Sequence, residues 1–176
     1  MKNIRFVTSA SPTLDERLLE NVYAVVAPAM RTNRRYYDPV SIEVALRAYE
    51  PHSFRDWSKP LLFSVFAYDG EKMVGTGFLQ HRKFDNITAE TDCGYLFGGF
   101  VLPEYQRQGI GRKIIETQIE HAKRVGIKVL RGNASKASLK LLQDLGFVEI
   151  GPYEDDALKH EDGAKAKLHI IELRLQ

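Results

Sequence analysis

The chain has 176 residues, 44% hydrophobic and 27% charged content, and a net charge of +2, which are ordinary values for a soluble globular protein. This charge is too small to indicate a nucleic-acid-binding protein, and the single cysteine, Cys93, excludes an internal disulfide. The longest apolar run, Val22–Met30, is too short to cross a membrane. We therefore expect one domain over residues 1–176, in the cytoplasm, with no membrane partner.

The first third of the chain predicts a strand followed by two helices. Ile4–Val7 is a short apolar run typical of a strand. Thr13 and Glu16 form a capping box that predicts the start of a helix with one apolar face. Pro28 falls late in this pattern and is expected to kink or end the helix. A second, short helix is expected over Ser41–Glu50.

The middle of the chain predicts strands. Leu61–Tyr68 and Met73–Gln80 flank an Asp-Gly turn at residues 69–72, which is a strong β-hairpin signal. The polar stretch 81–91 fits either a strand extension or a loop. The apolar segment Gly94–Leu102 predicts a strand, and its three glycines indicate a bulge or a close approach of the backbone to a ligand.

The last third alternates between helices and strands. Helices are expected over Arg112–Arg124 and Ser135–Leu145, and strands over Ile127–Leu130, Phe147–Ile150 and Leu168–Leu175. The resulting order predicts a mixed α/β fold around a mostly antiparallel sheet with at least one β-α-β crossover.

The segment Gln106–Arg112 carries the clearest chemical signal. It lies between an apolar strand and an amphipathic helix, and Gly109 and Gly111 let its backbone curl tightly. Backbone N–H groups in such a loop, together with the free N–H groups of the helix start, suit a phosphate or pyrophosphate. Arg107 and Arg112 could add positive charge at the rim.

Better-known phosphate loops do not match this segment. A Walker loop needs Gly-Lys-Ser/Thr, whereas Gly111 is followed by Arg112, and a dinucleotide fingerprint needs a glycine where this chain has Ile114. The segment does match Gln/Arg-x-x-Gly-x-Gly/Ala, and a second motif, Ala137–Phe147, ends in Gly-Phe. Together the two motifs, which span roughly residues 95–150, resemble the GCN5-related N-acetyltransferase (GNAT) family.

The resemblance implies a fold and a cosubstrate. The family fold has a mixed, mostly antiparallel sheet flanked by helices, in which two strands, here Gly94–Leu102 and Ile127–Leu130, splay apart around coenzyme A. The implied cosubstrate is acetyl-CoA, the implied acceptor is the primary amine of a small metabolite, amino acid or peptide, and no metal is expected. The implied coenzyme-binding residues are Phe100, Val101, Leu102, Gln106, Arg107, Gln108, Gly109, Ile110, Gly111, Arg112, Asn133 and Ser135.

The chain departs from the family where a general acid is often placed. Many members carry a tyrosine four residues before Gly-Phe, and here that residue is Leu142. Ser138, one helical turn earlier, could face the leaving sulfur, or it could lie on the helix surface. Tyr95 lies nearest to the position where some relatives carry a glutamate, and we expect it to relay a proton through water rather than to act as the base.

Acceptor specificity in this family usually comes from the first two helices and the loop between them. Here that loop includes Arg34, Arg35, Tyr36 and Tyr37, which suggest an acceptor that carries a carboxylate or a phosphate in addition to its amine. The same arginines also fit a solvated loop. The sequence leaves the oligomeric state open, a homodimer included, and it leaves a second function open: a module that binds acyl-CoA without catalysis.

Overall fold

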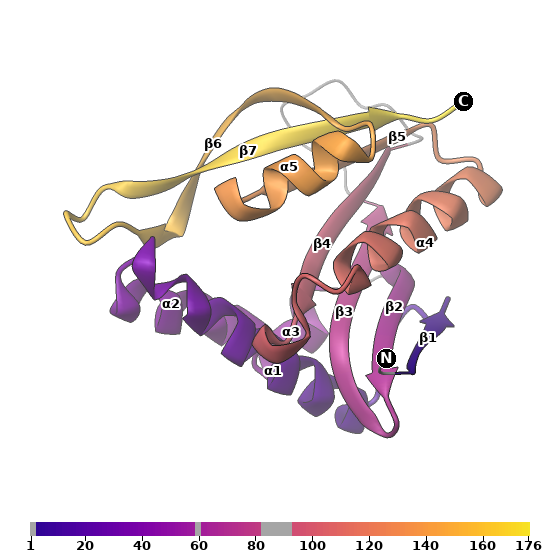
Figure 1. Ribbon diagram of the computed structural model, residues 1–176, viewed down its shortest axis with the longest axis horizontal. Helices are drawn as coiled ribbons and strands as arrows, with labels where there is room; N and C mark the ends of the chain where they lie inside the picture. Colours follow the sequence, from indigo (N-terminus) through magenta and orange to yellow (C-terminus); the bar gives the residue numbers. More distant parts are fainter. Residues whose placement is uncertain (1–2, 59–60, 82–92) are drawn as a thin grey trace.

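A computed structural model of the chain describes residues 3–58, 61–81 and 93–176 (Figure 1). In this part of the chain, seven strands form one sheet in the order β1-β2-β3-β4-β5-β7-β6. The β4–β5 pair is parallel and the other pairs are antiparallel, which confirms the expected mixed sheet. The strands are β1 Ile4–Ser9, β2 Leu61–Asp69, β3 Lys72–His81, β4 Cys93–Val101, β5 Val129–Ala134, β6 Val148–Lys159 and β7 Lys165–Arg174.

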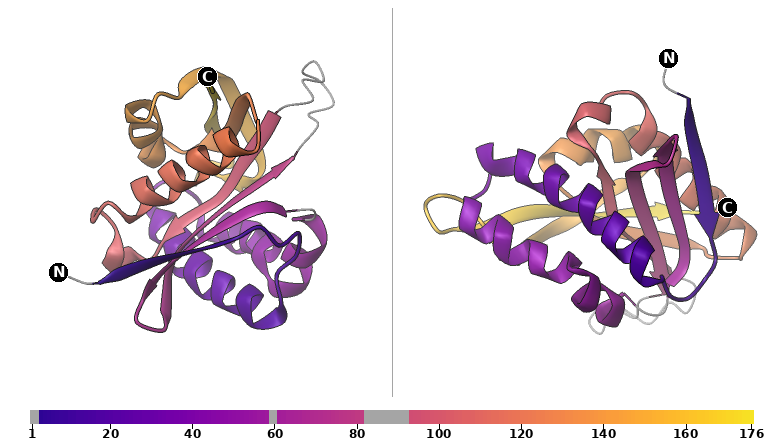
Figure 2. Two further views of the ribbon diagram at one scale, coloured as in Figure 1. Left: turned by 90° about the vertical axis from the view of Figure 1, so that its right-hand side faces the viewer. Right: turned by 90° about the horizontal axis from the view of Figure 1, so that it is seen from below.

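Helices cover both faces of the sheet (Figure 2). Helices α1, α2 and α3 lie on one side, and α4 and α5 lie on the other. Among the described residues, no helix combines the length and the apolar character that a membrane span needs. The helices are α1 Glu16–Arg31, α2 Pro39–Leu46, α3 Pro51–Trp57, α4 Ile110–Arg124 and α5 Lys136–Asp144, with short 3₁₀ turns η1 Thr32–Arg35, η2 Arg47–Tyr49 and η3 Pro103–Tyr105.

Helix α1 corrects the predicted start and end of the first helix. It begins at Glu16 rather than at Thr13, because the Asp15 carboxylate accepts the Leu18 N–H at 2.8 Å and caps it. Pro28 neither ends nor divides the helix, which continues to Arg31. The buried apolar face of the helix offsets the one backbone hydrogen bond that a proline cannot donate.

The region after α1 holds one helix that the sequence patterns did not predict. The predicted helix Ser41–Glu50 corresponds to α2, which begins two residues earlier than predicted, at Pro39, and is capped by the Asp38 side chain. The turn η2 follows the helix. Helix α3 follows at once, with Pro51 at its first position, where a missing N–H costs nothing. Its Phe54 is fully buried and stacks on Tyr49 with ring centroids 5.6 Å apart, which fixes η2 and α3 together.

The strand predictions are confirmed for the central hairpin and for β4. Strands β2 and β3 pair as expected. The expected bulge lies in β4, where the register to β3 shifts between Thr76 and Phe78 and Gly98 has φ +61°. Most of the stretch 81–91 lies outside the described residues.

The C-terminal strands are longer than predicted. Strand β5 runs four residues beyond Leu130, and β6 runs nine residues beyond Ile150. Strands β4 and β5 pair only from Cys93↔Val129 to Leu96↔Gly132, although β4 continues to Val101 and β5 to Ala134. The two strands therefore part beyond this point, and the predicted splayed pair is confirmed.

Candidate active site

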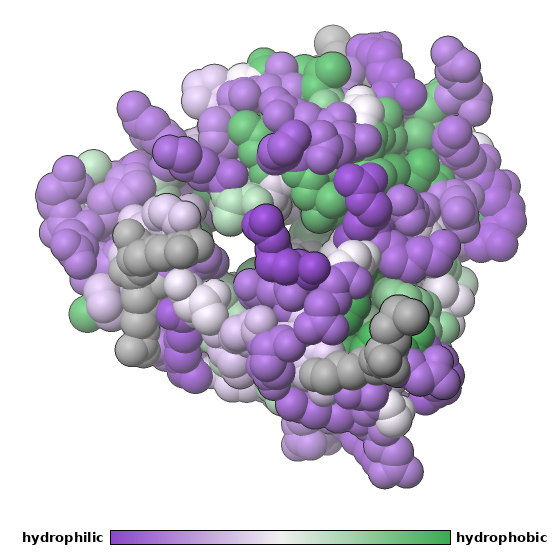
Figure 3. All heavy atoms as spheres, in the orientation of Figure 1, coloured by the Kyte–Doolittle hydropathy of each residue, from purple (hydrophilic) through white to green (hydrophobic). Residues whose placement is uncertain are grey.

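A cavity of about 470 Å³ opens where β4 and β5 part. The space-filling view shows that the face of the molecule seen in Figure 1 is hollowed near its centre (Figure 3). Its walls come from helices on both faces of the sheet and from strands β4, β5, β6 and β7. A pocket with mostly apolar walls and a few polar groups that extends from one face of the sheet toward the other can bring two substrates together from different sides.

The loop before α4 presents unpaired backbone donors. Arg107 and Gly109 both have left-handed backbone angles, with φ of 62° and 81°, and Gly109 is the residue that precedes the helix. The helix hydrogen-bonding pattern starts with the Lys113 N–H, which donates to the Gly109 carbonyl at 3.0 Å. The N–H groups of residues 110–112 therefore have no partner within α4, and they lie at the positive end of its dipole.

Side chains of the loop stabilise its shape. The Gln106 amide donates to the Val101 carbonyl at 3.0 Å, and the Gln108 amide donates to the Glu104 carbonyl at 3.1 Å. Arg112 lies 3.7 Å from the Asp144 carboxylate of α5, and both side chains are over 40% exposed. These contacts stabilise the conformation of the loop.

The backbone of β4 faces the gap at one of the three predicted positions. The Leu102 N–H donates to the Val74 carbonyl of β3 at 2.9 Å. Because N–H groups along a strand point alternately to opposite sides, the Val101 N–H points away from β3, toward the gap left by β5. Phe100 contributes its ring to the cavity wall, in a T-shaped contact with Tyr49 at 5.5 Å.

The start of α5 brings several predicted residues to the cavity. Asn133, Ser135, Ser138 and Leu142 all line it. Ser138 caps the helix, because its hydroxyl accepts the Ser135 N–H at 3.0 Å and lies 3.2 Å from the Ser135 hydroxyl. Ser138 therefore lies on the first turn of the helix and also forms part of the cavity wall. Leu142 is 7% exposed.

The predicted acceptor residues divide between two places. Tyr37 is buried and lines both the cavity and a smaller pocket of about 140 Å³, whereas Tyr36 is 41% exposed and lines only the smaller pocket of the two. Burial raises the pKa of the Tyr37 hydroxyl, and the nearby Asp155 and Tyr36 raise it further. Arg34 and Arg35 lie in η1, and their side chains fall outside the described part of the chain.

The comparison with protein families decides the identity. The model of the acetyltransferase (GNAT) family matches residues 26–147, which is more than half of the chain. The chain belongs to the GNAT acetyltransferase family. It is an N-acetyltransferase that uses acetyl-CoA, and the family likeness inferred from Gln106–Gly111 and Ala137–Phe147 is confirmed.

Solved structures agree with this GNAT fold. The GCN5-related N-acetyltransferase from Rhodopseudomonas palustris has a TM-score of 0.73 at 16% identity, with 96% of this chain and 98% of that chain covered. PaiA N-acetyltransferase from Thermoplasma acidophilum, in complex with coenzyme A, has a TM-score of 0.69 at 16% identity, with 97% and 99% covered. The ribosomal-protein-S18-alanine N-acetyltransferase from Escherichia coli has a TM-score of 0.65 at 20% identity, with 98% and 95% covered. No curated protein matches this chain.

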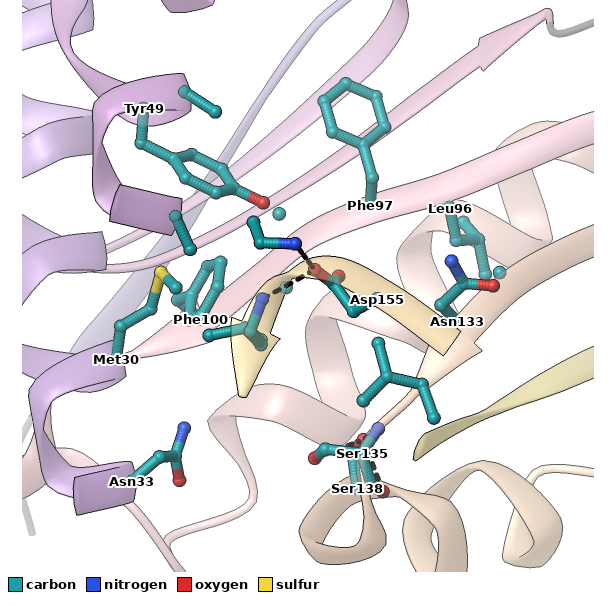
Figure 4. A pocket seen from close by; sticks show the side chains of 18 of the residues that line it. Met30, Asn33, Tyr49, Leu96, Phe97, Phe100, Asn133, Ser135, Ser138 and Asp155 are labelled. Carbon is teal, nitrogen blue, oxygen red and sulfur yellow. Dashed lines mark hydrogen bonds between the residues drawn. The ribbon is translucent and has the colours of Figure 1, made fainter. Parts of the chain in front are cut away.

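The GNAT cavity also contains polar groups that sequence reasoning missed. Tyr49, Gln118 and Asp155 line it from η2, α4 and β6, and Figure 4 shows Tyr49 and Asp155. Burial raises the pKa of the Tyr49 hydroxyl, and the nearby Tyr95 and Asp155 raise it further, so Tyr49 stays a neutral donor at pH 7. Gln118 is 3% exposed, and its Nε2 has no hydrogen-bond partner among the described residues. No local motif marked these three residues, because long-range packing brings them together.

Tyr95 lies in β4 on the cavity wall and is buried, with its ring stacked 6.3 Å from that of Phe97. It pairs in register with Arg131 of β5, just before the two strands part. The role of Tyr95 as a proton relay through water stays a prediction. Within the described residues, no group of three or more histidine, cysteine or acidic side chains could hold a metal ion.

Proposed function

We propose that this GNAT enzyme transfers the acetyl group of acetyl-CoA to the primary amine of a small metabolite, amino acid or peptide. The observation that carries the proposal is the position of the donor-rich loop before α4, between Phe100 of β4 and Ile115 of α4, which both line the cavity at the gap between β4 and β5. A pyrophosphate on the backbone N–H groups of Gln108–Arg112 would leave the rest of the coenzyme within reach of that gap.

The residues present fit this coenzyme. A Cβ built on Gly109 meets no atom within 4 Å, so the space in front of the loop is open to a pyrophosphate. The Val101 N–H could bind a carbonyl of the pantetheine arm. Gln118 adds a buried amide donor without a partner among the described residues, and a carbonyl of the ligand would accept a hydrogen bond from it. Asn133 and Ser135 lie at the same gap.

The reaction joins the amine nitrogen to the acetyl carbon while the carbon–sulfur bond breaks, and the ammonium group releases a proton. An amine with a pKa of about 10.4 is neutral in roughly one molecule in 2,500 at pH 7, which costs about 4.6 kcal/mol. Desolvation by the apolar part of the cavity wall disfavours the ammonium form and lowers this cost, whereas a carboxylate beside the amine raises it. In this proposal Tyr95 relays the proton through water, and the leaving sulfur needs little help from an acid.

Replacement of Leu142 tests the last point. We expect Leu142→Tyr to change kcat by less than tenfold, although a general acid typically contributes about 10² to 10⁴ in rate. The reason is that a thiol of ordinary pKa, about 8.5, takes a proton readily near pH 7, while the added ring strains a packed site. The measurement is kcat by thiol release from acetyl-CoA with a good acceptor.

Ser138→Ala belongs to the same experiment. It should also cost less than tenfold in kcat, together with about 1 kcal/mol of stability for the lost cap of α5. A gain of more than tenfold in Leu142→Tyr would contradict the proposal and favour the second candidate, a module that binds acyl-CoA without efficient transfer. Leu142 at the family's tyrosine position is the observation behind that candidate.

Binding and turnover of acetyl-CoA test the function itself. At 100 times its dissociation constant, acetyl-CoA should stabilise the fold by about 2.7 kcal/mol, which is roughly a 5–10 °C rise in Tm for a chain of this size. Thiol release with a broad panel of amines then separates the two candidates. A Tm that stays constant at millimolar acetyl-CoA would rule out both, whereas binding without turnover of any amine would leave only the module.

A further inference from the structure

The cavity wall carries one carboxylate and no described cation. Asp155 of β6 is the only acidic residue among the described residues that line the cavity, and that lining contains no lysine, arginine or histidine. The remainder of the wall is mainly aliphatic and aromatic, with Met30, Ile42, Phe97 and Phe100 among its members. The site as described therefore has a single negative charge in otherwise apolar and neutral polar surroundings.

The backbone of β6 orients this carboxylate. The register to β7 breaks between Asp155 and Lys159, and in this bulge the N–H groups of Ala157 and Leu158 donate to Asp155 Oδ1 at 2.8 and 2.9 Å. Both bonds end on one oxygen, and Oδ2 accepts no hydrogen bond from the described part of the chain. One oxygen thus holds the side chain in place, while the other is left for a ligand.

The neighbours of Asp155 favour a bound cation. Tyr49 and Asp155 project into the cavity from different walls, η2 and β6 (Figure 4). The raised pKa of Tyr49 keeps its hydroxyl neutral, so the tyrosine does not add a second negative charge. Tyr49 and Phe100 also line this cavity, with their ring centroids 5.5 Å apart, and aromatic rings attract cations through their faces.

We infer that Asp155 binds the ammonium group of the acceptor, and that the acceptor is a primary amine on an apolar or aromatic body with no carboxylate beside the amine. The inference rests on the proposed N-acetyltransferase function. A carboxylate on the carbon that bears the amine would lie next to Asp155 without a described counter-charge in the wall, which is unfavourable in an apolar cavity. The predicted contact of Arg34 and Arg35 with an anionic acceptor leads to the opposite preference, so an experiment can decide.

Matched pairs of acceptors test the substrate class. The probes are 2-phenylethylamine against phenylalanine, tyramine against tyrosine, and pentylamine against norleucine, with thiol release from acetyl-CoA as the readout. Each amine differs from its partner only by the carboxylate. We expect the amine to have at least a tenfold higher kcat/KM in every pair. A preference for the amino acid, or no turnover of any of the six probes while acetyl-CoA still binds, would overturn the inference.

Asp155→Asn tests the residue. The amide oxygen can still accept the N–H groups of Ala157 and Leu158, so the fold should persist, but the charge is lost. We expect KM for the amines to rise at least tenfold with a much smaller change in kcat, and the dissociation constant of acetyl-CoA to stay within twofold. Glu154→Gln is the matched control, because this neighbouring carboxylate is exposed and does not line the cavity.

The outcomes separate the inference from the function on which it rests. An unchanged KM in Asp155→Asn, or an equal rise in Glu154→Gln, would overturn the role of Asp155 while acetyl transfer stands. Loss of acetyl-CoA binding in the wild-type enzyme would instead overturn the proposed function. Asp155→Glu, which restores the charge one methylene further out, should recover part of the lost affinity for the amine if charge recognition is the cause.

Discussion

Gly109→Asp should lower the affinity for acetyl-CoA at least tenfold relative to Gly109→Asn. The new side chain would extend into the open space before the loop, where a Cβ meets no atom within 4 Å. A carboxylate about 5 Å from the two charges of a pyrophosphate costs about 0.8 kcal/mol for each charge even in water, or about 1.7 kcal/mol in total. That total corresponds to more than tenfold in the dissociation constant.

The asparagine variant is the necessary control, because Gly109 has φ +81° and any side chain there is strained. Aspartate and asparagine tolerate this conformation about equally well, so both variants should lose a similar amount of stability, about 1 kcal/mol. Isothermal titration with acetyl-CoA gives the affinities. S-acetylpantetheine, which lacks the pyrophosphate, should be used equally well by both variants. Equal affinities of the two variants for acetyl-CoA would refute the assignment of the pyrophosphate to this loop.

The loop Gln106–Arg112 and the helices beside it were predictable because their signals are local. Gly109 is required by a left-handed backbone at the start of α4, and that requirement is written in the residue itself. The apolar face of α4 and the Asp-Gly turn between β2 and β3 are likewise properties of short segments. The bulge in β4 could be predicted from the glycines at 94, 98 and 99 for the same reason.

The part of the cavity wall that holds Tyr49 and Asp155 was not predictable, because separate elements meet there. Asp155 lies in the polar run Glu154–Asp156, whose composition is typical of a loop, and it becomes part of a strand only by pairing with Ala166 of β7. The position of Tyr49 depends on its packing against α3. Pro51 and the polar residues of α3 give no clear helix signal in the sequence, although Phe54 anchors this helix in the core. Tyr49 and Asp155 reach the same cavity from η2 and β6, which lie far apart in the sequence, and tertiary contacts of this kind override local propensity.

The predicted end of β5 shows the same limit. The apolar pattern ends at Leu130, but the strand continues through Arg131 and Asn133 because the polar Arg131 has a charged partner on β7. A buried arginine cannot be recognised as a strand residue from its own sequence context. The pairing that makes it one, Arg131 opposite Glu172, joins positions 41 residues apart.

This pair leads to the largest effect on stability that we expect. Arg131 and Glu172 are 7% and 6% exposed, with Arg131 Nε 2.8 Å from the carboxylate, and Arg174 also donates to Glu172 at 3.0 Å. Arg131→Leu should lower the free energy of unfolding by about 3 kcal/mol, because removal of one partner leaves a buried charge. We place the value at the low end of the usual 3–5 kcal/mol, since Arg174, although largely exposed, keeps one contact with Glu172.

The double variant Arg131→Leu/Glu172→Leu should recover at least about 1 kcal/mol of that loss, because it removes the unpaired charge and replaces the pair with apolar groups. Urea unfolding at pH 7 measures both values. A double variant no more stable than Arg131→Leu would show that packing, rather than charge, holds β5 to β7. Neither side chain is among the described residues that line the cavity, so the double variant should bind acetyl-CoA like the wild type at a temperature where both are folded. A weaker affinity would mean that the pair also sets the opening between β4 and β5, since β5 beyond Gly132 has only β7 to hold it among the described strands.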